Sequence, residues 1–323
     1  MGFIFYTSQI SNLTNDIGVP QGSVLGPILF LVYINNLTNV PKFSNLLLFA
    51  DDTSLFLSDK NTQELEQKFF IDVNLTTQYL LENGLTVNTE KSNVMKFNHI
   101  RRRDIIDDLN VYIDKERLTV VNEINFLGIL IDKNLKFESH IDQICKKISS
   151  SLFMLRRLSP FCNEQILLNI YFGFIVPRIT YGIIIWGRSS TSIKNIFTLQ
   201  KISIRTIFNK PKRFSCKRIF KEKKILTLAS IYIYETITFF KGNIIQNFAD
   251  QQSIRNLSIQ TPSHRTSFYK KFPIYNMIKI FNKIPLHIKK ETNFKSFKKI
   301  LKDFLYMKAY YSIEEFLADD NTT

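Results

Sequence analysis

Two adjacent carboxylates, Asp51 and Asp52, are the side chains in this sequence best suited to metal or acid–base chemistry. The apolar run 46–50 precedes them and the β-prone run 53–57 follows, which predicts a hairpin with both acids at its turn. Two like charges beside apolar neighbours are costly unless a cation neutralises them, and Mg²⁺ prefers such oxygen ligands. The pair therefore indicates a phosphoryl-transfer metal site, although adjacent aspartates are also common turn residues.

A glycine-rich string stands upstream of this hairpin and leads into a long uncharged segment. It runs Gly18-Val-Pro-Gln-Gly-Ser23 and continues into the apolar residues 24–34. We expect a turn at Pro20, Gln21 and Gly22, where glycine allows close approach of the backbone to a ligand. The alternative is that this turn simply starts a buried helix.

The remaining patterns predict an α+β fold in which an antiparallel sheet is followed by helices. An amphipathic helix is expected over 61–82, closed by Asn83-Gly84 as a C-cap. Short strands follow, and from residue 137 the apolar period becomes helical. The expected strands are 85–87, 94–97, 111–113, 118–120 and 126–131, and the expected helices are 137–158, 163–175, 192–208, 228–246 and 292–306.

Four segments in order, over residues 15–135, resemble the reverse transcriptase domain of non-long-terminal-repeat retrotransposons, the jockey-like group in particular. They are residues 18–30, 49–52, 84–92 and 126–129. The remainder is similar to the thumb and C-terminal region of those elements, notably at 181–186 and 310–317. The resemblance implies a partial polymerase palm over 1–133, an α-helical thumb over 134–208 and a basic helical C-terminal region over 209–323.

The resemblance also implies roles for individual residues. Asp51 and Asp52 would hold Mg²⁺, two ions in a complete site, and Lys91 would lie near the nucleotide phosphates as a proton donor. The nucleotide and template would be contacted by Pro20, Gln21, Gly22, Phe49 and Ala50, and Leu127 and Gly128 would belong to a hairpin that steadies the primer end. The structural alternatives are that Lys91 is a solvated loop charge and that Leu127-Gly128 is a core strand with a bulge.

The function that follows from the resemblance is RNA-directed DNA polymerase activity on an RNA template, a DNA primer and deoxynucleoside triphosphates. The family's palm also uses an aspartate on a strand upstream of Gly18, and Asp16 lies in the wrong segment to replace it. We therefore expect a truncated element copy in which metal binding is weakened. The alternative function is that of a catalytically inactive, nucleic-acid-binding remnant.

Charge divides the chain into an acidic front and a basic back. Residues 1–130 carry 10 basic and 15 acidic side chains, and the rest carries 33 and 13, which favours a polyanionic partner. The phenylalanines 197, 208, 214 and 220 either stack on bases or, the reading we prefer, pack in the core. The predicted phosphate-binding residues are Lys201, Arg205, Lys210, Lys212, Arg213, Lys217 and Arg218.

Composition excludes several other classes. Hydrophobic residues at 45% and charged residues at 22% argue against a disordered chain, and Cys145, Cys162 and Cys216 lack zinc-ligand spacing. The apolar stretches 24–34 and 167–186 are too short or too interrupted to span a bilayer, and no signal peptide is evident. We expect an intracellular protein without stable membrane association, with core packing as the preferred role of the basic amphipathic run 287–304.

Overall fold

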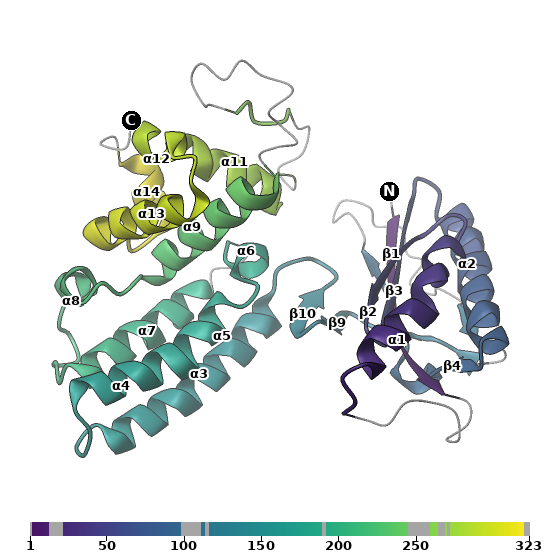
Figure 1. Cartoon of the computed structure of the whole chain (residues 1–323), viewed down its shortest axis with the longest axis horizontal. Helices are drawn as coiled ribbons and strands as arrows, with labels where there is room; N and C mark the ends of the chain where they lie inside the picture. Colours follow the sequence, from purple (N-terminus) through teal and green to yellow (C-terminus); the bar gives the residue numbers. More distant parts are fainter. Residues whose placement is uncertain are drawn as a thin grey trace. The chain divides into compact units, whose positions relative to one another are not determined.

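The computed structural model divides the chain into two compact units, Met1–Leu135 and Lys136–Thr323 (Figure 1). It describes the backbone of residues 2–12, and residues 22–97, 111–113, 116–188, 192–244, 259–263, 269 and 272–319. The first unit combines a sheet with covering helices and the second is helical. The predicted α+β class is confirmed, whereas the further division at residue 208 stays a prediction.

The first unit is built on a six-stranded sheet in the order β2-β3-β1-β5-β8, with β4 also paired to β1. All of its pairings are antiparallel except the parallel pair β5 and β8. Strand β1 was not foreseen from the sequence, yet it lies at the centre of the sheet. The strands are β1 Gly2–Asn12, β2 Asn45–Phe49, β3 Asp52–Asp59, β4 Leu85–Val87, β5 Asn93–Phe97 and β8 Thr119–Val120.

Helix α2, Thr62–Glu82, covers one face of this sheet, close to the predicted bounds. It starts where the Asn61 side chain accepts a hydrogen bond from the Gln63 N–H, and it ends before Gly84 at a φ of 66°. Its stripe of Leu65, Phe69 and Val73 packs against Leu55 and Leu57 of β3, together with a small group from β5 and the 111–118 segment. Each large apolar side chain buried there contributes about 1.5–3 kcal/mol.

Helix α1, Gly26–Ile34, is apolar on every side and buries only its C-terminal end. Ile34, with Leu37 of the 3-10 turn η1 (Asn35–Asn39), packs on Leu80 and Leu85. The outer positions stay open to solvent, with Ile28 and Val32 exposed at 57% and 70%. The alternative that the Pro20 turn simply starts a buried helix therefore does not hold for the outer side of α1.

A buried carboxylate fixes the chain where it enters the hairpin strand β2. Asp72 of α2 has no exposed surface, and its oxygens accept the backbone N–H groups of Lys42 at 2.8 Å, Phe43 at 3.0 Å and Ser44 at 2.5 Å. A buried charge needs such donors to offset its lost hydration. Asp72 thus sets the position of the segment from which β2 departs.

The second unit is an assembly of helices. The predicted helix over 163–175 continues through a π-helical turn to Thr180, and α8, α11, α12 and α14 were not predicted. The bounds are α3 Glu138–Leu158, α4 Glu164–Ile170, η3 Tyr171–Ile175, α5 Val176–Thr180, α6 Ile183–Trp186, α7 Ile193–Ile207, α8 Lys217–Glu222, α9 Leu228–Phe239, η4 Phe240–Ile244, α11 Pro273–Lys283, α12 Leu286–Lys290, α13 Phe294–Lys308 and α14 Ile313–Ala318. Two small hairpins complete the first unit, β6 Tyr112–Ile113 with β7 Glu116–Arg117 and β9 Glu123–Phe126 with β10 Ile129–Asp132.

The helical period read from residue 137 onward describes the core of the second unit well. The expected stripe on α3 is buried, apart from the half-buried Cys145. On α7, the fully buried Gln200 donates to the Tyr171 hydroxyl and the Leu226 carbonyl and accepts from the Leu228 N–H at 2.8 Å. Such complete satisfaction lets a polar side chain sit in an apolar core.

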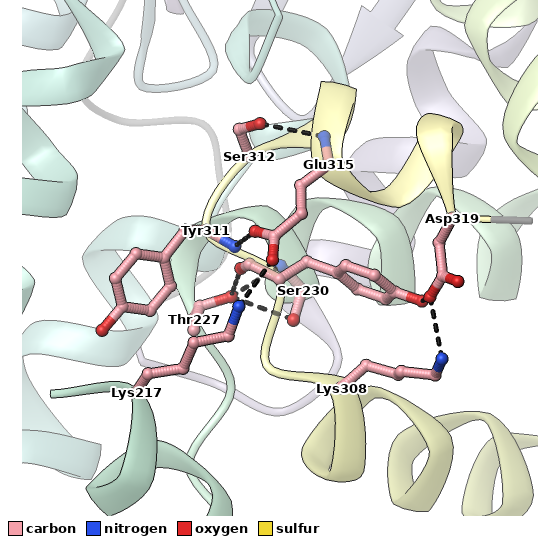
Figure 2. Close-up of polar contacts among 9 residues, drawn as sticks. Lys217, Thr227, Ser230, Lys308, Tyr311, Ser312, Glu315 and Asp319 are labelled. Carbon is pink, nitrogen blue, oxygen red and sulfur yellow. Dashed lines mark hydrogen bonds and ion pairs between the residues drawn. The ribbon is translucent and has the colours of Figure 1, made fainter. Parts of the chain in front are cut away.

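The last helix, α14, is held by a polar network (Figure 2). Glu315 accepts from Lys217 Nζ and from the Tyr311 N–H, both at 2.6 Å. Asp319 accepts from the Tyr310 hydroxyl at 2.7 Å and Lys308 Nζ at 2.8 Å. Residues 310–319, which include the segment 310–317 singled out in the sequence, therefore tie α14 to α8 and to the end of α13.

None of the helices in the described residues combines the length and the apolar character that crossing a bilayer requires.

Replacing Asp72 by alanine should lower the free energy of unfolding by about 3 kcal/mol, because three backbone donors lose their acceptor. Urea denaturation measures the loss, and amide hydrogen exchange at Lys42, Phe43 and Ser44 should accelerate. Gln67→Ala, at an exposed position of the same helix, is the control and should change stability by less than about 0.5 kcal/mol. Equal losses in the two variants would contradict this role for Asp72.

Acid should destabilise the helical unit through His140. This ring is 5% exposed and packs edge-on to Trp186 at 5.9 Å between centroids. Burial, with a smaller effect of Lys147, lowers the pKa of His140 below its ordinary 6.5. The unfolded chain therefore takes up the proton at a higher pH than the folded chain. The contribution of neutral His140 to stability is fully present above the unfolded pKa of 6.5 and is lost as the pH falls below it.

The melting temperature should consequently fall on acidification more steeply in the parent than in His140→Phe, which keeps an aromatic ring but cannot titrate. Thermal melts followed by circular dichroism across this pH range test the difference. Parallel pH profiles in the two proteins would show that His140 does not carry the effect.

Candidate active site on the sheet

The carboxylates Asp51 and Asp52 lie at the tip of the β2–β3 hairpin, as the flanking runs predicted. Phe49 pairs with Asp52, so only Ala50 and Asp51 form the turn, and Ala50 takes a left-handed φ of 51°. The Asp51 side chain is exposed and that of Asp52 is half-buried. Ala50 is exposed, and the Phe49 side chain is exposed at 60%. The tip therefore presents two carboxylates and an aromatic ring to the surroundings.

The alternation of side chains along β3 places Asp52 on the face opposite α2. Leu55 and Leu57 point toward α2, so Asp52, Ser54 and Phe56 point to the other face. The Phe56 ring meets the Phe126 ring edge-on at 6.5 Å between centroids and 87° between planes. The β9–β10 hairpin thus covers the same sheet face that carries Asp52.

The turn of that second hairpin is formed by Leu127 and Gly128, directly after Phe126. Their φ angles are 46° and 80°, and Phe126 pairs with Ile129 across the turn. Two left-handed residues match a two-residue hairpin turn, and a non-glycine residue in that region costs about 1–3 kcal/mol. The strand expected over 126–131 is therefore wrong, because the chain reverses at Leu127 and Gly128, where the resemblance implied a hairpin.

Lys91 lies at the same end of the sheet as Asp52. Asn93 pairs with Thr7, and Thr7 pairs with Ser54, so these three form one row across the sheet. Lys91 precedes Asn93 by two residues, as Asp52 precedes Ser54, and two strand spacings amount to about 10 Å. Lys91 is exposed and ends the 3-10 turn η2, Thr89–Lys91, whose start is capped by Asn88.

The position facing Asp52 on the neighbouring strand is Gln9. The β1–β3 register pairs Gln9 with Asp52 and Ser8 with Thr53, and the sequence of β1 contains no acidic residue. Within the described residues, no group of three or more His, Cys, Asp or Glu side chains is arranged to hold a metal ion. Asp51 and Asp52 are hard oxygen ligands that fit Mg²⁺ chemically, as a pair.

The predicted nucleotide-binding turn is only partly covered by the structure. Pro20 and Gln21 lie outside the described residues. Gly22 has a φ of 90°, a conformation that favours glycine, and the Gly26 N–H donates to the Ser23 hydroxyl at 3.0 Å where α1 begins.

Five of the seven predicted phosphate-binding residues have side chains that contact other groups of the chain, and two are exposed in a turn. Lys217 pairs with Glu315 and Arg218 with Glu222, both at 2.6 Å, while Arg205 Nε donates to the Phe214 carbonyl at 2.9 Å. Lys201 and Lys210 lie over the rings of Phe197 and Phe214. Lys212 and Arg213 are exposed in the turn between α7 and α8. The sequence thus predicted the basic region, but it did not indicate which of these charged side chains already have partners.

Three residues that the sequence did not point to also lie at these candidate sites. Phe56 and Phe126 join the two hairpins, and the alternation along β3 was the available signal for Phe56. An open hollow of about 420 Å³ beside the ends of α7 and α8 brings in Lys223, which pairs with Glu164 at 2.6 Å.

The sequence of this chain is similar to a known protein family and to several known proteins. Residues 4–131 match the family described as reverse transcriptase (RNA-dependent DNA polymerase). The chain is 28% identical over 199 residues to a probable RNA-directed DNA polymerase from the transposon X-element of Drosophila melanogaster, covering 59% of this chain and 21% of the relative.

Two further relatives give the same picture. The RNA-directed DNA polymerase from the mobile element jockey of Drosophila funebris is 26% identical over 206 residues, covering 60% of this chain and 22% of the relative. A probable RNA-directed DNA polymerase from the transposon BS of Drosophila melanogaster is 28% identical over 207 residues, with coverage of 60% and 22%. The chain therefore spans about a fifth of the length of these curated relatives.

The contact between Phe56 and Phe126 should couple the two hairpins energetically. In a double-mutant cycle of Phe56→Ala, Phe126→Ala and the double variant, the coupling in unfolding free energy should be about 0.5–1.5 kcal/mol. Phe70→Ala, an exposed aromatic position of α2, paired with Phe126→Ala is the control cycle and should be additive. Additivity in both cycles would show that the β9–β10 hairpin is not held to the sheet by this pair.

Proposed function

We propose that this protein is the polymerase part of a non-LTR retrotransposon. Its residues 4–131 form a reverse transcriptase domain of the jockey-like type. The reaction is attack of a primer 3′ hydroxyl on the α-phosphate of a deoxynucleoside triphosphate, directed by an RNA template. The observation that carries this proposal is that Asp52 and Phe56 lie on one face of the six-stranded sheet, and that the β9–β10 hairpin, whose turn is Leu127-Gly128, packs on that face through the contact between Phe126 and Phe56. A growing primer end and its metal ligands must meet on such a face.

In this proposal Asp51 and Asp52 hold Mg²⁺ at the hairpin tip. When bound, the ion supplies Lewis-acid stabilisation of the charge that develops on the transferring phosphoryl group. Phe49 and Ala50, the residues just before the pair, line the approach to the nucleotide. The exposed position of Asp51 leaves that carboxylate open to an ion and a substrate.

Lys91, Gly22 and the Leu127-Gly128 turn take the supporting roles. Lys91 stands at the Asp52 end of the sheet, where its ammonium group neutralises triphosphate and donates a proton to the leaving pyrophosphate. Gly22, with Pro20 and Gln21, lies near the nucleotide and the template. Leu127 and Gly128 steady the primer end, for which a rigid two-residue turn is well suited.

The architecture that accompanies this function is a partial polymerase palm over residues 1–133. We assign residues 134–208 to a helical thumb and residues 209–323 to a basic C-terminal region. The partners are an RNA template, a DNA primer and deoxynucleoside triphosphates.

A second candidate is a catalytically inactive protein that still binds nucleic acid. The observation that favours it is Gln9, a neutral amide at the position paired with Asp52. A two-metal centre depends on carboxylate charge, so a neutral partner weakens the hold on the ions. The basic surface does not depend on those ions and would keep its function.

Primer extension with Mg²⁺ on an RNA template distinguishes the two candidates. The parent should extend the primer, and Asp51→Asn should lower the rate about a hundredfold or more. Asp142→Asn makes the same chemical change at an exposed position outside the reverse transcriptase segment and should leave the rate unchanged. Binding of the hybrid without extension by the parent would support the inactive protein, and equal rates in parent and Asp51→Asn would refute the assigned site.

A third carboxylate at position 9 should strengthen metal binding. Directly paired positions on antiparallel strands have β-carbons about 5 Å apart, so Gln9→Asp brings a further negative charge to the Asp52 end of the sheet. Titration calorimetry with Mn²⁺ should show affinity about tenfold higher than in the parent. Gln9→Asn is the matched neutral control, and equal affinities in the two variants would mean that position 9 does not face the metal site.

A further inference from the structure

The most concentrated charge in the described residues lies on the segment Asn209–Lys224, between the end of α7 and the end of α8. It holds eight Lys and Arg and a single Glu. Both helices end on a left-handed residue, Asn209 at a φ of 46° and Lys224 at 49°, which turns the chain and displays the flanking cations. This segment lies outside residues 4–131, the part matched by the reverse transcriptase family.

The two ends of this segment adjoin one another. Phe208, Asn209 and Lys210 from the end of α7 line the same open hollow as Ile219, Glu222 and Lys223 of the α8 region. The carboxylates at the hollow are already neutralised, Glu222 by Arg218 and Glu164 by Lys223. The surface therefore carries its positive charge without a competing free carboxylate at the hollow.

Four cations of this surface remain available for a ligand. Across the described parts of the chain, no hydrogen bond, ion pair or ring contact involves the side chains of Lys212, Arg213, Lys221 or Lys224, and all four are exposed. Lys217, by contrast, is held by Glu315 in the network of Figure 2. These four charges thus lie in the turn after α7, with Lys212 and Arg213, and at or just after the end of α8, with Lys221 and Lys224.

The aromatic rings of the region are already covered. Lys210 lies over Phe214 at 5.6 Å and Lys223 over Phe208 at 5.2 Å. Phe197 stacks on Phe220 at 6.5 Å and meets the Tyr311 ring at 4.9 Å, with Lys201 over its face at 4.6 Å. A base that stacked on the lysine-covered face of Phe197, Phe208 or Phe214 would have to displace that lysine.

The same stretch lacks the apolar anchors of a membrane-binding surface. Within residues 192–227, all of which are described, no large apolar side chain is strongly exposed. An interfacial helix needs such side chains to enter the headgroup region, besides its cations. The observations therefore favour a nucleic-acid backbone over an anionic lipid surface.

We infer that the segment Asn209–Lys224 binds the sugar–phosphate backbone of nucleic acid through Lys212, Arg213, Lys221 and Lys224, without stacking on bases. This inference rests on the proposed function for its partner, but it assigns the contact to a surface outside the reverse transcriptase segment. Binding through charge alone is independent of base sequence and strongly dependent on salt. The surface would hold nucleic acid near the protein whatever its sequence.

The test uses the full chain with Lys212, Arg213, Lys221 and Lys224 all changed to glutamine. Fluorescence anisotropy with a labelled RNA–DNA hybrid, without nucleotides or Mg²⁺, measures affinity over a range of salt concentrations. The variant should bind about tenfold or more weakly, and its plot of log affinity against log salt should be shallower by about 3. The control changes the exposed Lys146, Lys279, Lys295 and Lys299 to glutamine, which removes the same charge and should keep the parent slope.

A second comparison separates charge from stacking. The fold loss caused by the quadruple substitution should be the same on a natural DNA single strand and on an abasic strand of equal length. A loss about tenfold smaller on the abasic strand would show that these residues support stacking and would overturn the inference. Equal losses in the variant and the control would also overturn it, as would phosphatidylserine vesicle binding that falls in the variant while hybrid binding does not.

This experiment is independent of the polymerase proposal. A chain that fails to extend a primer, yet shows the predicted loss of hybrid binding in the variant, would remove the polymerase activity and keep this surface. Circular dichroism of both quadruple variants should match the parent, because all the substituted residues are exposed.

Discussion

The alternation of side chains along β3 is the constraint on which the candidate site depends. Leu55 and Leu57 are committed to the α2 core, so the pleat directs Asp52 and Phe56 to the other face. A shift of one residue in the register would bury Asp52 and expose both leucines, at a cost of several kcal/mol. Packing against α2 on one face of the sheet therefore directs the candidate catalytic carboxylate of Asp52 to the opposite face.

The elements around β3 limit how far that arrangement can relax. Asp72 holds the chain entering β2 by accepting hydrogen bonds from three backbone N–H groups. The pairing of β1 with β3 fixes the position of Asp52 opposite Gln9. In the helical unit, the buried Gln200 and the network around Glu315 act in the same way, joining α7 to α9 and α8 to α14. In both units a few fully satisfied polar groups position segments that carry exposed charge.

The sequence predicted the elements whose signals are local. The cap and stripe of α2, the β2–β3 hairpin and the buried face of α3 all follow from short-range period and turn chemistry. Strand β1 was missed although its first residues are β-prone, and its central place in the sheet depends on pairing with β3, 43 to 57 residues later. The apolar run over 126–131 did not predict the reversal at Leu127, because a leucine in a left-handed conformation violates the usual turn preference, whereas the family resemblance implied a hairpin there. The partner of Lys217 is 98 residues away, so which lysines stay free could not be read from the sequence.

The proposed polymerase site requires that the hairpin tip bind a divalent cation. Paramagnetic broadening of backbone amide signals by substoichiometric Mn²⁺ measures this directly. Broadening should be strongest at Ala50–Thr53 and should disappear in a variant that carries both Asp51→Asn and Asp52→Asn. Broadening centred on other acidic residues, or unchanged in that variant, would contradict the account.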